Sequence, residues 1–418
     1  MPVRRTSLPM SFPLGCLAAV LSGAGGVCSE WPQWGGPTRD FHSPVKGLPE
    51  SWPPAGPAKL WSRPLGEGYS GIAVTRDMLV TMYRKGDAEV VVALNAASGK
   101  TIWEYSYKAP FLAGMDMQNG PGPHSTPLVI NGRVYAVGAT GKLHCLQLKT
   151  GKLLWEHRLI ERLKGSILER GYSASPLAYK TSVILPVGGK GRALVAFHQA
   201  TGAIIWSGHD SESSNSSPIL IDAAGRQQLV AFLAATVAGL NPDTGAVLWS
   251  HPHRTEWNLN VATPVWNGDG LLFISSAYNG GSRVLKLTST GPKVTVSQLW
   301  ANPRVRVHFT NAVRIDDHLY TSSGDFGPAF LTAVDVKSGK IAWQRRGLPR
   351  ASMLYADSKL ILLDEDGNLS LAKVSPQQHE IKSSVKVLDN NAWTAPSIAG
   401  SRLYLRDRKQ IIALDLTK

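Results

Sequence analysis

Ala333–Trp343 reads AVDVKSGKIAW, and close copies of this stretch recur along the chain. It begins with an alternating apolar run, continues with a polar turn that ends in Ser-Gly, and closes with a second apolar run and a Trp. Alternation with a period of two indicates a β-strand. The Gly can adopt the positive φ that a tight turn needs. The stretch therefore predicts a β-hairpin.

Four further copies share the strand, the Ser-Gly or Thr-Gly turn and the closing Trp: Ala93–Trp103 (ALNAASGKTIW), Cys145–Trp155 (CLQLKTGKLLW), Ala196–Trp206 (AFHQATGAIIW) and Gly239–Trp249 (GLNPDTGAVLW). A single hairpin is marginally stable in water. Similar hairpins repeated at a long period predict a repeat architecture, in which each unit covers the apolar surface of the next.

Each unit also opens with small polar residues, often followed by Pro, that lead into an apolar strand. The openings are Gly71-Ile72, Thr126-Pro127, Ser175-Pro176, Ser217-Pro218, Thr263-Pro264, Asn311-Ala312, Ser352-Met353 and Ala395-Pro396. They predict an all-β fold, an eight-bladed β-propeller with four strands in each blade. The units that contain Leu285–Trp300 and Leu371–Val385 are irregular, so seven blades is the competing count.

The two ends of the body carry complementary parts of the repeat. Lys59-Leu60-Trp61 resembles its end without its beginning, and Ala413–Lys418 resembles its beginning without its end. We therefore expect a ring that spans residues 59–418. In this ring the N-terminal strand Ala58–Trp61 supplies the outermost strand of the last blade.

Residues 1–29 have the features of a secretory signal peptide: Arg4 and Arg5, an apolar stretch, and small residues before Ser29. We expect cleavage near Ser29 and a periplasmic or extracellular location. The alternative is a lipid anchor on Cys28, although Gly25-Gly26-Val27 fits a lipobox poorly. Residues 30–58 are rich in Pro and Gly. They predict an extended arm that lies on the body through its tryptophans, Trp31, Trp34 and Trp52.

The net charge of +14 becomes +12 without Arg4 and Arg5, because residues 1–29 contain no acidic residue. The positive charges are scattered over turns, and no nucleic-acid-binding module is recognisable, so we expect no nucleic-acid partner. Cys145 is the one cysteine beyond the signal region. We expect it to be a buried apolar residue without an internal disulfide.

The pattern A-[LV]-D-x-x-[TS]-G-K-x-x-W resembles the PQQ-like (pyrrolo-quinoline quinone-like) repeat, and the resemblance extends from Lys59 to Lys418. This repeat builds the eight-bladed propellers of quinoprotein dehydrogenases and of the BamB-like lipoproteins of outer-membrane β-barrel assembly. The resemblance implies the fold, while function resides in non-repeated sites.

An enzyme of the quinoprotein type would imply PQQ beside a calcium ion held by Glu, Asn and Asp, an Asp base, and commonly two adjacent cysteines. This chain has no adjacent cysteines, and none of its acids can be matched to those ligand positions. We therefore assign no catalytic residue. We expect no cofactor, with PQQ and calcium only if the chain is an enzyme after all.

Two stretches could suggest a metal site. Asp364-Glu365-Asp366-Gly367-Asn368 has acidic residues at close spacing, but it lacks the distant Glu of a calcium loop and is typical of a hairpin turn. His251-Pro252-His253 offers two imidazoles, and we interpret it as a solvated loop outside any regular element. We therefore predict no metal site.

In a propeller, the loops that enter the first strands converge on one end of the central channel. These loops carry candidate binding residues for a polar ligand or a peptide loop: His124, Arg170, Tyr172, Asn215, Asn260, His308, Asn311, Arg350, Asn391 and Trp393. The alternative is that they only satisfy backbone groups and water at the end of the channel.

The sequence thus predicts an exported, non-catalytic β-propeller that acts as a scaffold for proteins of the cell envelope. It would associate with membranes only through partners or a lipidated Cys28. The alternative is a small PQQ-binding quinoprotein oxidoreductase that acts on alcohols or sugars. A third class is binding of polysaccharide or anionic polymer through the basic surface.

Overall fold

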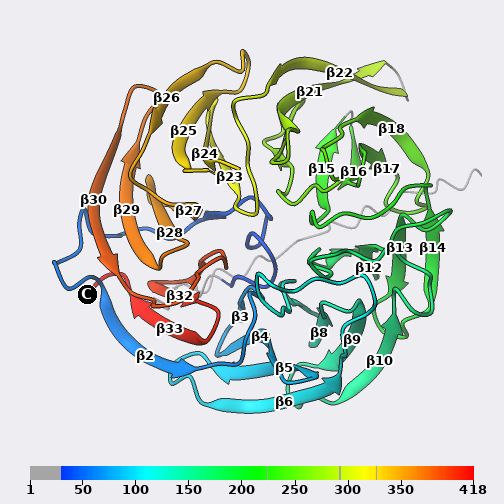
Figure 1. The fold of residues 1–418 in the computed structure, drawn as a ribbon, viewed down its shortest axis with the longest axis horizontal. Coiled ribbons are helices and arrows are strands. Elements are labelled where there is room, and N and C mark those ends of the chain that lie inside the picture. Colours follow the sequence, from blue (N-terminus) through cyan, green and yellow to red (C-terminus); the bar gives the residue numbers. More distant parts are fainter. Residues whose placement is uncertain (1–29, 224, 291–292, 326) are drawn as a thin grey trace, which may run out of the picture.

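The computed structural model describes residues 30–418 except 224, 291–292 and 326, and it forms a closed ring of eight sheets (Figure 1). This confirms the predicted all-β, eight-bladed propeller and excludes the count of seven. The expected signal peptide, residues 1–29, lies outside the described residues. In the part of the chain that is described, no helix is both long and apolar enough to span a membrane.

The first four blades follow one another along the chain, each as an antiparallel meander. Blade 1 contains β3 (Ala73–Thr75), β4 (Met78–Lys85), β5 (Ala88–Asn95) and β6 (Thr101–Lys108). Blade 2 contains β7 (Leu128–Ile130), β8 (Arg133–Val137), β9 (Lys142–Gln147) and β10 (Leu153–Arg158). Blade 3 contains β11 (Leu177–Tyr179), β12 (Ser182–Pro186), β13 (Leu194–His198) and β14 (Ile204–Gly208). Blade 4 contains β15 (Ile219–Ala223), β16 (Arg226–Phe232), β17 (Thr236–Leu240) and β18 (Val247–Pro252).

The other four blades include the irregular units and the closure. Blade 5 contains β19 (Val265–Trp266), β20 (Leu271–Ser276), β21 (Gly281–Thr290) and β22 (Lys293–Asn302). Blade 6 contains β23 (Ala312–Ile315), β24 (His318–Ser323), β25 (Phe330–Asp335) and β26 (Ile341–Arg345). Blade 7 contains β27 (Ala351–Ala356), β28 (Lys359–Asp364), β29 (Asn368–Val374) and β30 (His379–Lys386), with β1 (His42–Ser43) added in parallel to β27. Blade 8 contains β31 (Ser397–Ala399), β32 (Arg402–Arg406), β33 (Gln410–Asp415) and β2 (Ala58–Pro64).

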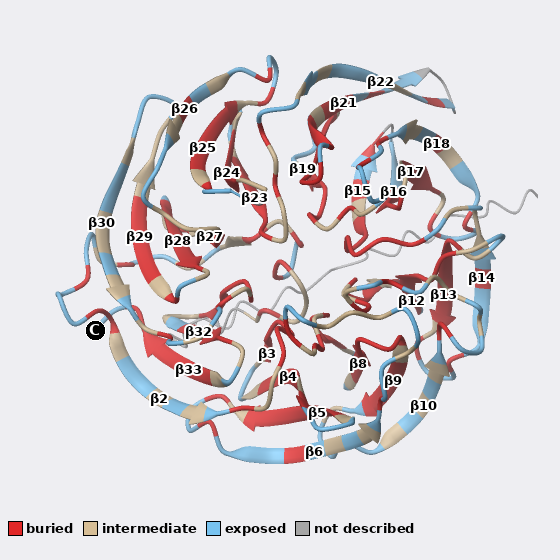
Figure 2. Ribbon diagram, viewed as in Figure 1, coloured by how far each residue is buried: buried red, intermediate tan, exposed pale blue. Residues whose placement is uncertain are grey.

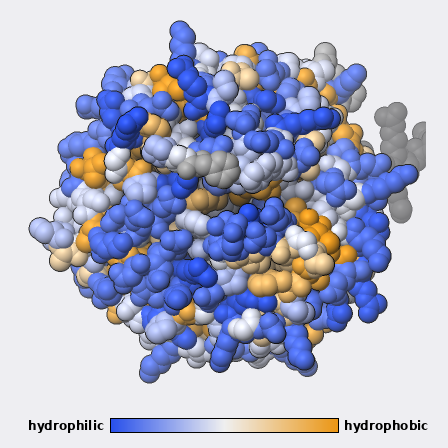
Figure 3. All heavy atoms as spheres, viewed as in Figure 1, coloured by the Kyte–Doolittle hydropathy of each residue, from blue (hydrophilic) through white to orange (hydrophobic). Residues whose placement is uncertain are grey.

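The inner strands of each blade are buried and the outermost strand is half exposed (Figure 2). In β6, for example, Trp103 is buried while its neighbours Ile102 and Glu104 are exposed. Apolar side chains of adjacent blades pack against each other, so the core is distributed around the ring. In the view of Figure 3 the surface is largely hydrophilic, and its hydrophobic residues form separate groups.

The repeated Gly and Trp form one structural unit between neighbouring blades. The indole N–H of most repeat tryptophans donates to a carbonyl of the next blade, as from Trp103 to Leu148 (2.8 Å) and from Trp300 to Val336 (2.8 Å). Trp249 is the exception, because its indole donates to Gln228 Oε1 of its own blade (2.7 Å). In most cases the indole ring also covers the turn Gly of the next blade. The pairs are Trp61–Gly99, Trp103–Gly151, Trp155–Gly202, Trp206–Gly245 and Trp300–Gly339. Glycine is required twice there, for its positive φ and for the space that the ring occupies.

Replacing Gly151 by Ala tests this unit. A Cβ on Gly151 would lie 2.5 Å from the Trp103 ring, and such overpacking costs about 1–3 kcal/mol. Gly132→Ala is the matched control, because Gly132 has the same φ of +70° and nothing within 4 Å of its Cβ position. We expect denaturant unfolding to show the larger loss of stability for Gly151→Ala. Equal losses of stability in the two variants would show that the positive φ alone causes the loss and that the contact with Trp103 contributes nothing.

The N-terminal strand completes the ring. β2 pairs antiparallel with β33, with Ala58 opposite Asp415 and Trp61 opposite Ala413. The Trp61 indole donates to the carbonyl of Ala96 in blade 1 (3.1 Å). The outer strand of blade 8 and its contact with blade 1 therefore come from the start of the body, while the inner strands come from its end.

The first part of the arm, up to β1, passes through the middle of the ring, where it is dark blue in Figure 1. Trp31 forms a bridge with Val74 of blade 1, and Arg39 donates to the carbonyls of Ser175 and Pro176 at blade 3. The His42 ring contacts the Arg314 carbonyl of blade 6 at 2.9 Å. The second part runs outwards over blade 7, where the Trp52 amide donates to Ser383 of β30 (2.7 Å).

Three smaller expectations can be compared with the structure. Cys145 is buried and unpaired, as predicted. Asp364 forms a turn, because its Oδ1 accepts hydrogen bonds from the backbone of Asp366 and Asn368. The interpretation of His251-Pro252-His253 as a solvated loop was wrong. His251 and Pro252 belong to β18, and His253 is buried against Ser276, because the outer strand of blade 4 continues further than its Trp suggests.

Candidate functional site

A cavity of about 580 Å³ opens among the loops that enter the first strands, and we call it the funnel. Six of the ten predicted candidates line it: His124, Arg170, Asn215, His308, Arg350 and Trp393. They come from loops before β7, β11, β15, β23, β27 and β31. The convergence expected from propeller geometry therefore brings together residues from six blades.

The other four candidates lie outside the funnel lining. Tyr172 is buried and donates to the Pro186 carbonyl (2.7 Å). Asn260 is buried and donates to the Leu233 carbonyl (2.6 Å). Asn311 links blade 6 to blade 7 by two hydrogen bonds with the backbone of Met353. Asn391 is exposed, and its carbonyl accepts from the Arg408 amide. The first three satisfy buried backbone groups, which is the role of most buried amides and hydroxyls.

Trp34 of the arm also lines the funnel. Its indole N–H donates to Thr263 Oγ1 (2.8 Å), at the entry to blade 5. Its ring lies edge-on to Phe41, with centroids 5.0 Å apart. The sequence predicted that Trp34 would contact the body. The Thr263 contact lies 229 residues away along the chain, so no local pattern could place the indole in the channel.

Aromatic rings form a continuous series around one side of the funnel, which we call the aromatic arc. Its members, each in ring contact with the next, are Trp257, Tyr278, His308, Phe309, Trp393, Tyr69 and His124, with centroid separations from 4.8 to 5.9 Å. Trp257 is 53% exposed. Trp257, Tyr278, Phe309 and Tyr69 were not among the predicted candidates. Trp257 and Phe309 lie in the same entry loops as the candidates Asn260 and His308, whereas Tyr278 lies in the turn between β20 and β21.

Polar side chains occupy the facing side, which we call the polar arc: Asp116, Gln118, Arg170, Ser173, Asn215 and Ser217. They belong to the loops before β7, β11 and β15, in blades 2, 3 and 4. The aromatic arc is drawn mainly from the entries of blades 5, 6, 8 and 1. The funnel therefore has a side rich in aromatic rings, which also contains Arg350, and a side rich in hydrogen-bonding groups.

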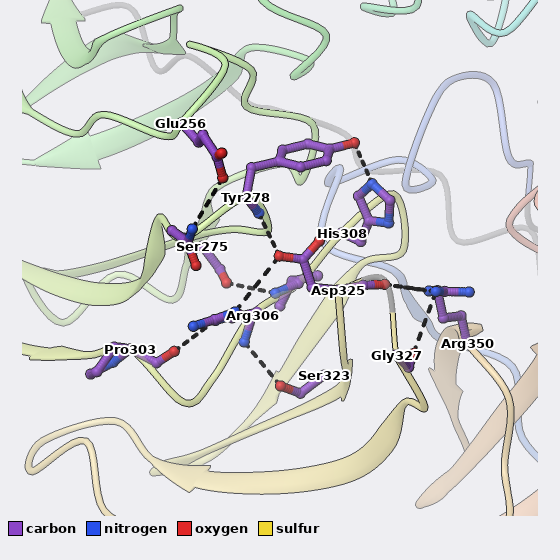
Figure 4. A network of polar contacts seen from close by, with 12 residues as sticks. Glu256, Ser275, Tyr278, Pro303, Arg306, His308, Ser323, Asp325, Gly327 and Arg350 are labelled. Atoms are coloured by element: carbon purple, nitrogen blue, oxygen red, sulfur yellow. Dashed lines mark hydrogen bonds and ion pairs between the residues drawn. The ribbon is translucent and has the colours of Figure 1, made fainter.

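Both arginines of the funnel are paired with carboxylates. Arg170 contacts Asp116 at 2.9 Å and Glu169 at 3.6 Å. Arg350 binds Glu365 at 2.9 Å, and the Trp393 indole donates to the same carboxylate (3.1 Å). Figure 4 shows Arg350 reaching the backbone of Asp325 and Gly327 as well. The funnel consequently offers little uncompensated charge, in contrast to the basic chain as a whole.

The two funnel histidines are neutral at physiological pH. Burial lowers the pKa of His124 to about 4 and that of His308 to about 4, because the charged form loses its hydration. The Tyr278 hydroxyl lies 2.5 Å from His308 Nε2, and Figure 4 shows the phenol pointing towards that imidazole. Neutral imidazole can donate from one nitrogen and accept at the other.

Asn215 Oδ1 has no hydrogen-bond partner among the described residues. Asn215 is 9% exposed, and its Oδ1 has almost no exposed surface. This oxygen therefore lies beneath the funnel surface and is not presented to a molecule inside the funnel.

Fold and site define a β-propeller of PQQ-like repeats with one lined funnel. The profile of the family described as outer membrane protein assembly factor BamB matches residues 87–345. This range is more than half of the chain, and the chain belongs to that family.

Individual relatives are distant. The chain is 22% identical to outer membrane protein assembly factor BamB of Shewanella oneidensis over 261 residues, which are 58% of this chain and 62% of that protein. It is 30% identical over 116 residues to the dehydrogenase subunit of a quinone alcohol dehydrogenase of Gluconobacter oxydans, or 27% of this chain and 14% of that one. The match thus spans less than two thirds of either protein.

Solved structures of a BamB protein and of a quinoprotein dehydrogenase share the fold. BamB from Moraxella catarrhalis aligns with a TM-score of 0.59 at 16% identity, over 85% of this chain and 97% of that one. Quinohemoprotein alcohol dehydrogenase from Comamonas testosteroni aligns with a TM-score of 0.66 at 13% identity, over 93% and 81%. These likenesses show the propeller and leave the function to the site.

The resemblance to quinoprotein dehydrogenases implies a quinone with a calcium ion if the chain is an enzyme, and the funnel residues do not fit that pair. Calcium binds several carboxylate and carbonyl oxygens. Here Asp116 and Glu365 are committed to Arg170 and Arg350, and Asp325 accepts from the Tyr278 amide and faces Arg306. Within the described residues, no three His, Cys, Asp or Glu side chains are arranged to hold a metal ion.

Proposed function

We propose that this protein is an exported, non-catalytic β-propeller that binds other proteins of the cell envelope and assists the assembly of outer-membrane proteins. The proposal rests on membership of the BamB family. It is supported by the observation that the carboxylates in and beside the funnel are held by arginines and backbone amides. A periplasmic location, after removal of residues 1–29, belongs to the same proposal.

Two surfaces are available to a protein partner. One is the rim of the funnel, where Trp257 is exposed. The other is the outer edge of the blades, where the residue before each repeat Trp is often apolar and exposed. Examples are Ile102 (44%), Leu154 (44%), Ile205 (46%) and Leu299 (43%). Exposed apolar side chains and unpaired strand edges are common sites of protein association.

Affinity purification of the tagged full-length chain from crosslinked envelope fractions of its host tests the proposal. We expect outer-membrane β-barrel proteins or their assembly factors to be recovered. Trp257→Ala alters the funnel rim, while Ile204→Glu with Ile205→Glu alters an outer edge, so each variant is the control for the other. Recovery of no envelope protein with the unaltered chain would contradict the proposal.

The alternative function is a PQQ-binding oxidoreductase, favoured by the local match to the Gluconobacter enzyme subunit. Incubation of the purified chain with PQQ and calcium separates the two. Under our proposal, the quinone absorbance remains with the unbound fraction after gel filtration, and no dye is reduced with alcohols or aldoses. Bound quinone with substrate-dependent dye reduction would establish the enzyme.

A further inference from the structure

The two sides of the funnel differ in the kind of ligand surface that they prefer. The aromatic arc presents ring faces and edges, which attract flat apolar surfaces and C–H groups. The polar arc presents an amide, hydroxyls and an Arg–Asp pair. Because Arg170 and Asp116 lie side by side, this side offers donors and acceptors next to each other. A ligand that matches both sides has one apolar face and an edge of groups that donate and accept hydrogen bonds.

The charge of the funnel selects a neutral ligand. Arg170 and Arg350 are each bound to a carboxylate, and both histidines are uncharged at neutral pH. An anion would have to take an arginine from its carboxylate, which leaves a partly buried acid without its partner. A cation would be repelled by the two arginines. Neither an anion nor a cation therefore gains as much binding free energy in the funnel as a neutral molecule does.

The exposed groups of the polar arc indicate the polar groups of that ligand. Gln118 presents an exposed amide, and Arg170 and Asp116 present donors beside acceptors. A hydroxyl group can pair with each of these groups, since it both donates and accepts. The volume of about 580 Å³ is within the usual range of small-molecule pockets.

We propose that the funnel is a binding site for a neutral saccharide. The C–H face of a pyranose ring lies against the aromatic arc, at Trp257 and Trp393, and its hydroxyls face Gln118, Arg170 and Asp116. Trp34 of the arm bounds the site from within the channel. This site is separate from any protein-docking edge of the blades, and it differs from polymer binding through the basic surface because it does not depend on charge.

Calorimetry and tryptophan fluorescence with maltotriose, cellotriose, chitotriose and xylotriose as probes test this site on the chain without residues 1–29. We expect at least one probe to bind saturably, with an affinity that does not change between low and moderate salt, because a neutral ligand releases no counterions. Trp257→Ala should weaken binding about tenfold or more. Ile204→Ala on β14, which removes an equally exposed side chain outside the funnel, should leave it unchanged.

Gln118→Ala gives a second test, because Gln118 is an exposed member of the polar arc and its loss should not disturb folding. We expect weaker binding with unchanged thermal stability. The proposal is overturned if no probe binds at millimolar concentration, or if choline or PQQ binds the funnel more tightly than every saccharide. A failed envelope-protein purification has no bearing on this outcome, since the saccharide assay uses the isolated chain.

Discussion

Replacing Arg406 by Ala lowers the free energy of unfolding by about 3 kcal/mol or more, because it removes the central connection of the ring closure. Arg406 is fully buried in β32. Its guanidinium donates to the carbonyls of Met82 (2.7 Å) and Gly68 (2.8 Å) and to Thr81 Oγ1 (3.2 Å), all from the start of the body. Burial lowers its pKa to about 9, and it is still charged at neutral pH.

The matched control is Arg402→Ala. Arg402 lies in the same strand and carries the same charge, but it is exposed, so its loss should change stability by less than about 0.5 kcal/mol. Arg406→Lys should be intermediate, since one ammonium cannot reach several acceptors held by a planar fork. Denaturant unfolding measures the stabilities. Hydrogen exchange should accelerate in blades 1 and 8 first, and equal stability of the two alanine variants would refute the role of Arg406.

The second large effect is expected at the ion pair of Arg84 and Glu89, which lies within blade 1 where that blade meets blade 2. Glu89 is fully buried, its Oε2 accepts from Tyr107 (2.8 Å) and its Oε1 accepts from the Ala139 amide (3.0 Å). Arg84 lies 3.7 Å from the same carboxylate and above the Phe111 ring. Arg84→Ala should cost about 3–5 kcal/mol at neutral pH, because it leaves a buried carboxylate without its cation.

The pH dependence of this variant has a defined sign. Burial raises the pKa of Glu89, and Arg84 opposes that rise. Without Arg84 the pKa rises further. A raised folded-state pKa contributes stability below the unfolded value, and this contribution is lost as pH rises through the folded value. The deficit of Arg84→Ala should therefore grow as the pH rises above the ordinary pKa of a glutamate.

A double variant isolates the charge. Glu89→Gln keeps an oxygen that can accept from Ala139 and Tyr107 but carries no charge. Added to Arg84→Ala, it should recover part of the lost stability at neutral pH and remove the pH dependence of the deficit. If Arg84→Ala has the same free energy of unfolding as the unaltered chain at neutral pH, the buried Glu89 carboxylate does not require Arg84 for its stability, and the prediction is wrong.

The sequence predicted which loops form part of the candidate site, but not how their side chains are oriented and paired. Propeller topology was sufficient to bring His124, Arg170 and Trp393 to one end of the channel, because every blade enters at the same side. It could not show that Tyr172 and Asn311 turn into the blades to satisfy backbone groups. Which way a loop side chain turns depends on neighbours that are distant in sequence, and the same holds for the pairing of Arg350 with Glu365.

The architecture was determined by the sequence alone. A recurring strand, Gly turn and Trp, exemplified by Ala333–Trp343, has a geometry that places most of the tryptophans against a turn of the next blade. The split repeat at Lys59–Trp61 and Ala413–Lys418 fixes the seam. These are short-range patterns, so they can be read along the chain. The tertiary structure decided that Trp34 occupies the channel, that Arg406 holds the seam, and that aromatic rings gather opposite polar groups in the funnel. Each of these depends on contacts between residues that lie far apart in the sequence and meet only when the ring closes.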